Sequence, residues 1–91
     1  MISRRLIISG RVQGVFYRGW SVETARALGV GGWVRNRRTG EVEIFATGSA
    51  EAVDALIERR WQGPSAARVD DIAIEELPVE PHDGFGQRPT A

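Results

Sequence analysis

Apolar and polar residues follow patterns along the first half of the chain that predict three β-strands. An apolar run predicts a strand over residues 4–9, which Gly10 ends. Residues 33–35 predict a second strand, and in residues 41–47 every second side chain is apolar or small, which is typical of a strand with one buried face. Residues 36–40 carry turn formers at both ends and predict a hairpin loop between these two strands.

Two other stretches carry apolar residues at three- and four-residue spacing, which predicts helices with one buried face. The first helix is predicted to begin near Trp20 and to end at Gly29. The second is predicted to begin with Ser49 as its N-cap and to end at Gly63. Its charged residues 58–60 predict a solvated face. The buried stripe of the second helix is predicted to consist of Val53, Leu56, Ile57 and Trp61.

The last third of the chain predicts a fourth strand and a short edge strand. Residues 67–77 alternate with a change of phase at Asp70 and Asp71, which predicts a bulge or an irregular start there. Residues 85–88 predict the short strand. The order strand-helix-strand, repeated twice, predicts an α+β fold of the ferredoxin-like βαββαβ type, with an antiparallel sheet and both helices on one face. We expect residues 1–91 to form a single domain.

The composition is that of an ordinary globular domain without excess charge. The 91 residues are 42% hydrophobic and 26% charged, and twelve basic residues balance twelve acidic ones. Such a neutral domain is a poor electrostatic partner for nucleic acid. There is no cysteine, and the single histidine, His82, lacks a neighbouring carboxylate cluster, so no metal site is predicted. The apolar run near the N-terminus is too short for a signal peptide or a membrane span, so we expect a cytoplasmic protein.

Residues 10–18, between the first strand and the first helix, combine two glycines with Arg18 near the start of the predicted helix. Gly10 and Gly14 allow sharp turns, and consecutive backbone N–H groups in such a turn can form a concave anion site. The N-terminus of a helix adds unpaired N–H groups and the positive end of the helix dipole. Arg18 adds a planar guanidinium that can bind two phosphate oxygens at once. These features predict a phosphate site, with an ordinary surface arginine beside a common glycine spacing as the alternative.

Few other side chains could take part in a reaction. Asp70 and Asp71 are adjacent on a predicted strand and point to opposite faces, which excludes a paired-carboxylate site. There is no set of nucleophile, histidine and carboxylate with the spacing of a hydrolase triad. A reaction at the predicted phosphate site would therefore rely on positioning and on electrostatic stabilisation.

Three segments of the chain together resemble the acylphosphatase family. They are residues 10–18, 32–36 and 40–43, which occur in this order on the expected elements, and residues 63–69 also fit the family pattern. The resemblance covers residues 5–77. It implies the ferredoxin-like fold and the hydrolysis of acyl phosphates, which are carboxyl-phosphate mixed anhydrides, to a carboxylate and inorganic phosphate.

The resemblance also implies the residues of the site. Arg18 matches the arginine that binds the phosphoryl group, and Asn36 matches the asparagine that orients the attacking water. The 13–17 loop matches the loop whose backbone N–H groups hold the phosphate, and its residues are Gln13, Gly14, Val15, Phe16 and Tyr17. No metal or organic cofactor is implied. The expected partner is a small-molecule acyl phosphate, with no nucleic acid and no membrane, and we expect a monomer.

Several positions allow a second interpretation or depart from the family pattern. Asn36 is also a common first residue of a turn. Arg37 and Arg38 either steer an anionic substrate or are solvated charges of the hairpin. Tyr17 stands where phenylalanine is more usual, so its hydroxyl needs a partner or solvent. Residues 85–88 are a weak match to the last strand of the family, which predicts a short or frayed strand.

Two other functions fit the same fold. Ferredoxin-like domains also bind RNA on the sheet face, but residues 40–46 lack the aromatic pattern that this requires. An acylphosphatase-like domain can also handle carbamoyl phosphate within a larger maturation enzyme, and the length of the chain argues against this function.

Overall fold

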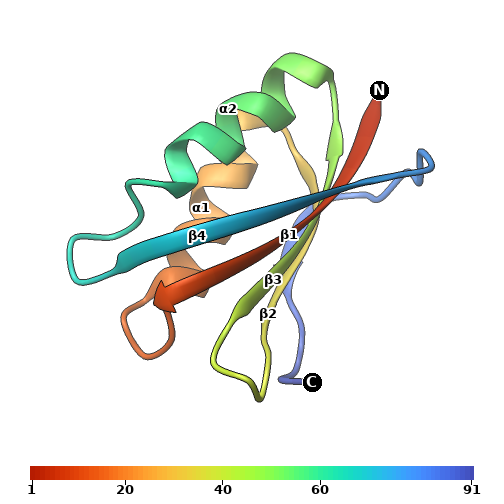
Figure 1. The fold of residues 1–91 in the computed structure, drawn as a ribbon. Helices are drawn as coiled ribbons and strands as arrows, with labels where there is room; N and C mark the ends of the chain where they lie inside the picture. Colours follow the sequence, from red (N-terminus) through yellow and green to blue (C-terminus); the bar gives the residue numbers. More distant parts are fainter.

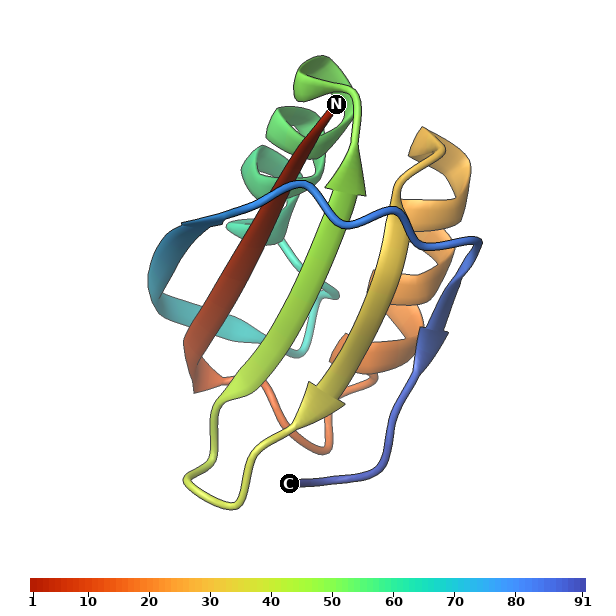
Figure 2. The same ribbon diagram turned by 90° about the vertical axis from the view of Figure 1, so that its right-hand side faces the viewer.

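A five-stranded sheet covered on one face by two helices forms the protein (Figures 1 and 2). The computed structural model describes all of residues 1–91. The strands lie in the order β4-β1-β3-β2-β5. The elements are β1 (Ile2–Arg11), α1 (Tyr17–Leu28), β2 (Gly31–Asn36), β3 (Val42–Gly48), α2 (Ala50–Arg60), β4 (Arg68–Leu77) and β5 (Phe85–Gln87). The predicted ferredoxin-like βαββαβ fold is confirmed.

The four long strands pair antiparallel, as predicted, whereas the short β5 pairs parallel with β2. The sheet is therefore mixed at one edge. The parallel pair holds Gln87 of β5 opposite Val34 of β2. After β5 the chain continues along β2, because the Arg88 N–H donates to the Val34 carbonyl (2.9 Å) and the Ala91 N–H to the Asn36 carbonyl (3.1 Å). This strand and its continuation thus border the end of β2.

The predicted bulge on β4 is confirmed and shapes the exit of β1. Ser9 pairs with Asp71 and Gly10 with Val69, so Asp70 has no partner in β1. Gly10 has a φ of +125°, and a Cβ at this position would overlap the backbone carbonyl of Arg68. Only glycine fits this close approach, which sends the chain from β1 into the loop before α1.

The core lies between the sheet and the helices. On β3, Val42, Ile44 and Ala46 are fully buried against the helical layer, as the alternating pattern predicts. The same core includes Leu6 and Ile8 of β1. Ser49 caps α2 through its side-chain oxygen, which accepts a hydrogen bond from the Ala52 N–H (3.1 Å).

The opposite face of the sheet is partly covered by the chain itself. Residues 78–84 cross over its upper end (Figure 2). Glu43 is buried there and pairs with Arg5 (3.5 Å) and Arg35 (2.7 Å). The ring of Phe45 is 6% exposed. This face thus presents paired charges, and its partly buried Trp33 stacks on Phe45 with 6.2 Å between the ring centroids, unlike the free aromatic rings on which RNA bases stack. No helix has the length and apolar character needed to span a membrane.

The end of α2 differs from the prediction. Trp61 was expected in the buried stripe and Arg60 on the solvated face, but Trp61 is 50% exposed and Arg60 is fully buried. The helix ends at Arg60. Val53, Leu56 and Arg60 follow one another at spacings of three and four residues, so Arg60 lies on the buried stripe of the helix. Trp61 is rotated away from this stripe.

The buried Arg60 has no acidic partner. Its guanidinium carbon lies 5.5 Å from the ring centroid of Tyr17 and 5.4 Å from that of Trp20, and the group donates to the Ser21 hydroxyl. Its Nε and one terminal nitrogen have no hydrogen-bond partner in the chain. Burial lowers the pKa of Arg60 to about 10. A buried, partly unsatisfied cation therefore lies between the two helices.

We expect Arg60→Met to raise the free energy of unfolding by about 1–3 kcal/mol, because an unbranched apolar side chain can fill the same space without a buried charge. Urea denaturation at neutral pH measures this change. Arg59→Met, at an exposed position of the same helix, is the matched control and should change stability by less than about 0.5 kcal/mol. A clear loss of stability in Arg60→Met would mean that the contacts with Tyr17 and Trp20 outweigh the cost of burying the charge.

Candidate active site

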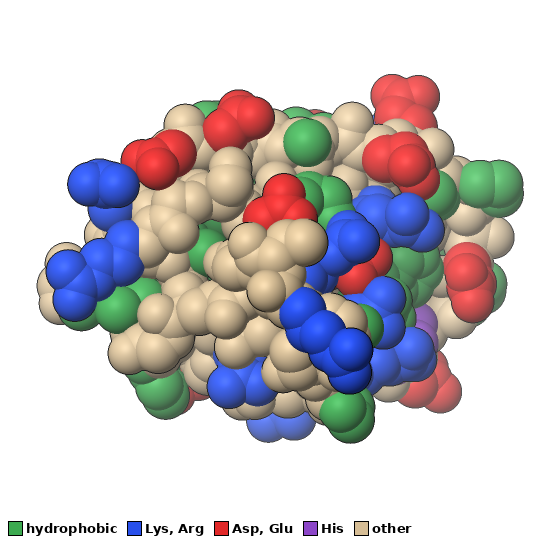
Figure 3. Space-filling view, turned by 60° about the horizontal axis from the view of Figure 1, so that its bottom comes forward, with side chains coloured by type: hydrophobic (Ala, Val, Ile, Leu, Met, Phe, Trp, Pro, Cys, Tyr) green, Lys and Arg blue, Asp and Glu red, His purple; other side chains and the backbone are tan.

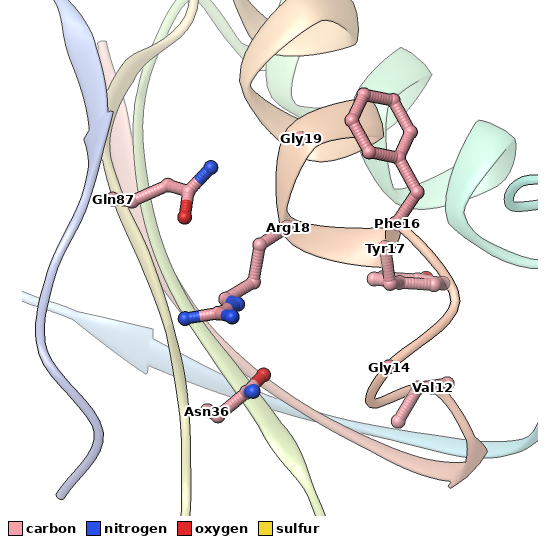
Figure 4. A pocket seen from close by; sticks show the side chains of 8 residues that line it. All are labelled: Val12, Gly14, Phe16, Tyr17, Arg18, Gly19, Asn36 and Gln87. Atoms are coloured by element: carbon pink, nitrogen blue, oxygen red, sulfur yellow. The ribbon is translucent and has the colours of Figure 1, made fainter.

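A cavity of about 150 Å³ opens where the loop before α1 meets the ends of β2 and β5. Its lining residues are Val12, Gly14, Phe16, Tyr17, Arg18, Gly19, Asn36 and Gln87 (Figure 4). Basic side chains, with acidic ones between them, lie on the surface at this end of the molecule (Figure 3). The cavity thus brings together the two side chains that the sequence singles out, Arg18 and Asn36, and Arg18 is the charged residue of its lining.

The backbone N–H groups of the loop before α1 have no hydrogen-bond acceptor within the chain. None of the amide groups from Gln13 to Gly19 donates a hydrogen bond within the chain, and the first helical bond is that of the Trp20 N–H to the Phe16 carbonyl (2.9 Å). Gly14 and Phe16 adopt left-handed backbone conformations, with φ of +72° and +65°. A loop with alternating backbone hand and free N–H groups at a helix N-terminus is suited to bind an anion.

The residues of the 13–17 loop differ in their position relative to the cavity. Gly14, Phe16 and Tyr17 line the cavity, whereas Gln13 and Val15 do not. The Gln13 side chain instead donates to the backbone carbonyls of Arg37 and Glu41, both at 2.8 Å. It ties the loop to the β2–β3 hairpin, and so fixes the loop relative to the end of β2.

Tyr17 anchors the other end of the loop. Its side chain is buried, and its hydroxyl donates to the Arg60 carbonyl (2.9 Å), which supplies the partner that a tyrosine at this position requires. Burial raises the pKa of Tyr17, with Arg60 opposing the rise, so the hydroxyl keeps its proton. The helix begins at Tyr17 rather than near Trp20, because the left-handed Phe16 turns the backbone into α1 without a side-chain cap.

Arg18 projects from the first turn of α1 toward Asn36 (Figure 4). Its guanidinium has no acidic partner and makes no hydrogen bond within the chain, in contrast to Arg5 and Arg35, which are both paired with Glu43. An unpaired guanidinium in a cavity keeps its planar set of donors available for an anionic ligand.

Asn36 is the last residue of β2, and its side chain faces Arg18 (Figure 4). Its Oδ1 atom is buried and has no hydrogen-bond partner in the chain. Most buried polar atoms in folded proteins are hydrogen-bonded, so an unpartnered acceptor in a cavity indicates a site for a donor such as water or a ligand. A residue that served only to start the hairpin would not require this buried oxygen.

Gln87 is a lining residue that the sequence does not predict as part of the site. It reaches the cavity because β5 pairs parallel with β2, and a three-residue edge strand gives no pattern from which this pairing can be predicted. Arg37 and Arg38 do not line the cavity, so their role in steering stays a prediction. No group of three or more histidine, aspartate or glutamate side chains is placed to hold a metal ion.

Comparisons with known proteins agree with one another. The acylphosphatase family model matches residues 4–86. The acylphosphatase of Acidovorax sp. (strain JS42) is 53% identical over 89 residues, covering 98% of this chain and 92% of that protein. The acylphosphatase of Rhizorhabdus wittichii is 48% identical over 89 residues, covering 98% of this chain and 90% of that protein. The crystal structure of acylphosphatase from Bacillus subtilis matches with a TM-score of 0.94 and 36% identity, covering 97% of this chain and 99% of that one. In sequence and in fold alike, the chain belongs to the acylphosphatase family.

Proposed function

We propose that the protein hydrolyses acyl phosphates by holding the phosphoryl group between Arg18 and the backbone N–H groups of the 13–17 loop, while Asn36 orients the attacking water. The hydrolysis of acyl phosphates itself follows from membership of the family. The observation that carries the assignment of residues is the unpaired Arg18 guanidinium, which faces the buried and unpartnered Oδ1 of Asn36 across one cavity.

The phosphoryl group meets donors on two sides in this arrangement. The transition state of phosphoryl transfer is loose and spreads negative charge over three equatorial oxygens. Free backbone N–H groups of the loop and the planar fork of Arg18 can bind these oxygens without rearrangement. Because Gln13 and Tyr17 fix both ends of the loop, the donors are held in place before the substrate arrives.

The attacking water is assigned to Asn36. A water that donates one hydrogen to Oδ1 satisfies this buried acceptor and keeps its lone pair directed at phosphorus. An amide cannot remove the proton, so the water attacks with its proton still largely attached. As the oxygen–phosphorus bond forms and the phosphorus–acyl oxygen bond breaks, the acyl phosphate dianion and water give a carboxylate and dihydrogen phosphate. A carboxylate is a good leaving group, so a general acid is not needed.

The assay that tests the proposal uses the purified protein with benzoyl phosphate. We expect turnover that is unchanged by a chelator, because no step requires a metal ion. Inorganic phosphate should inhibit competitively, raising KM and leaving kcat unchanged, because product and substrate share the same donors. Loss of activity with the chelator would contradict the mechanism, and so would inhibition by phosphate that lowers kcat without raising KM.

A further inference from the structure

Gln87 is the one polar side chain of the cavity that the mechanism above does not use. It comes from β5, on the side of the cavity away from the 13–17 loop, and its carboxamide is directed toward Arg18 (Figure 4). The side chain makes no hydrogen bond within the chain and is exposed. An exposed glutamine turns freely about its last bond, so it can present either its N–H₂ group or its oxygen to a ligand.

The position of Gln87 relative to Asn36 fits the geometry of the reaction. In Figure 4 the two carboxamides lie on opposite sides of the Arg18 guanidinium. In phosphoryl transfer the attacking and leaving oxygens lie roughly in line, on opposite sides of phosphorus. If phosphorus lies beside the guanidinium and the water lies on the Asn36 side, the acyl group leaves on the Gln87 side.

The exposure of Gln87 agrees with departure of the acyl group on its side of the cavity. The phosphoryl group must reach the loop N–H groups and Arg18, whereas the acyl group extends toward the opening of the cavity. Gln87 lines the cavity and is exposed, so it is positioned to contact this group. The backbone around it is held in place, since Gln87 pairs with Val34 and the following Arg88 N–H donates to the Val34 carbonyl (2.9 Å).

We infer that Gln87 contacts the acyl group of the substrate and donates a hydrogen bond from Nε2 to the departing carboxylate. The inference rests on the proposed mechanism. Negative charge develops on the acyl oxygen as its bond to phosphorus breaks, and a neutral donor stabilises that charge more in the transition state than in the bound substrate. The same contact makes Gln87 a determinant of specificity among acyl phosphates, because the benefit is largest for acyl groups that leave poorly.

The test compares a series of ring-substituted benzoyl phosphates whose carboxylic acids differ in pKa. Gln87→Met removes the donor and keeps the length of the side chain. We expect kcat/KM to fall about 10-fold to 100-fold for unsubstituted benzoyl phosphate and less for substrates with electron-withdrawing groups. A plot of log kcat/KM against the pKa of the departing acid should therefore become steeper. Gln87→Ser, whose side chain is too short to reach, should give the same steeper slope.

The inhibition constant of inorganic phosphate provides the second readout. It should stay within about twofold of the wild-type value in Gln87→Met, because phosphate lacks the acyl group. Gln62→Met, the same substitution at an exposed position outside the cavity, is the matched control and should leave slope and rates unchanged.

Two results would overturn the inference. Parallel plots for wild type and both Gln87 variants would mean that the side chain does not meet the leaving group. A loss of phosphate affinity equal to the loss of kcat/KM would place Gln87 on the phosphoryl group or in a structural role. Failure of the mechanism itself would look different, because the wild-type protein would then turn over benzoyl phosphate without competition by inorganic phosphate.

Discussion

Arg18→Ala is expected to lower kcat/KM for acyl phosphates by about 10³-fold or more, because it removes the only charged group that faces the phosphoryl oxygens in the cavity. The protein should stay folded. The guanidinium makes no ion pair or hydrogen bond within the chain, so no hydrogen bond or ion pair of the folded state is lost with it. Steady-state kinetics with benzoyl phosphate measure the effect, and circular dichroism verifies the fold.

Two further variants separate the shape of the Arg18 side chain from its charge. Arg18→Lys keeps the charge but loses the planar fork, so it should recover only part of the activity. Arg59→Ala removes one exposed arginine of α2 and should leave kcat/KM near the wild-type value, which controls for the change in net charge. Turnover of Arg18→Ala within a few-fold of wild type would rule out the role assigned to this residue.

Asn36→Ala is expected to lower kcat by about 10²-fold to 10³-fold while the inhibition constant of phosphate changes little. Placement of the water matters mainly in the transition state, whereas phosphate is held by Arg18 and the loop. Stability should not fall, because the substitution removes a buried oxygen that has no partner. The measurements are kcat with benzoyl phosphate, inhibition by phosphate and urea denaturation.

The alternative for Asn36 is a structural role at the start of the hairpin. In that case, Asn36→Ala would lower kcat and phosphate affinity together and would reduce the free energy of unfolding. This pattern would contradict the assignment of the attacking water to Asn36.

The fold could be predicted from local patterns wherever one face of an element is buried. The alternation of Val42, Ile44 and Ala46 identifies β3, and the Ser49 cap identifies the start of α2. The bulge at Asp70 was visible as a change of phase in the apolar residues. These signals depend only on residues close together in the sequence, which is why the predicted elements agree with the structure.

Features that depend on contacts between distant segments could not be predicted. Arg60 lies on the apolar stripe of α2, but a charged residue gives no sign that it will be buried against Tyr17 and Trp20. The early start of α1 depends on the left-handed Phe16, and bulky residues rarely adopt this conformation. Sequence rules for capping therefore placed the start of α1 too late.

Physical reasoning from the sequence predicted only some of the residues of the candidate site. The glycines and Arg18 indicated a phosphate site as one of two interpretations, because their chemistry is local, and the family resemblance decided in its favour. Asn36 became a candidate through the family resemblance alone, since an asparagine before a hairpin is common. Neither local chemistry nor the family resemblance indicated Gln87, because this residue reaches the cavity through the parallel pairing of β5 with β2.

The central claim is that backbone N–H groups before α1 bind a phosphoryl group together with Arg18. The most direct measurement is a titration of the isotope-labelled protein with inorganic phosphate, followed through the amide resonances. We expect the resonances of Gly14, Phe16 and Tyr17 to shift and saturate together, and the same titration of Arg18→Ala to require a much higher phosphate concentration. Resonances of this loop that stay unmoved at saturating phosphate, or an unchanged midpoint in Arg18→Ala, would contradict the account.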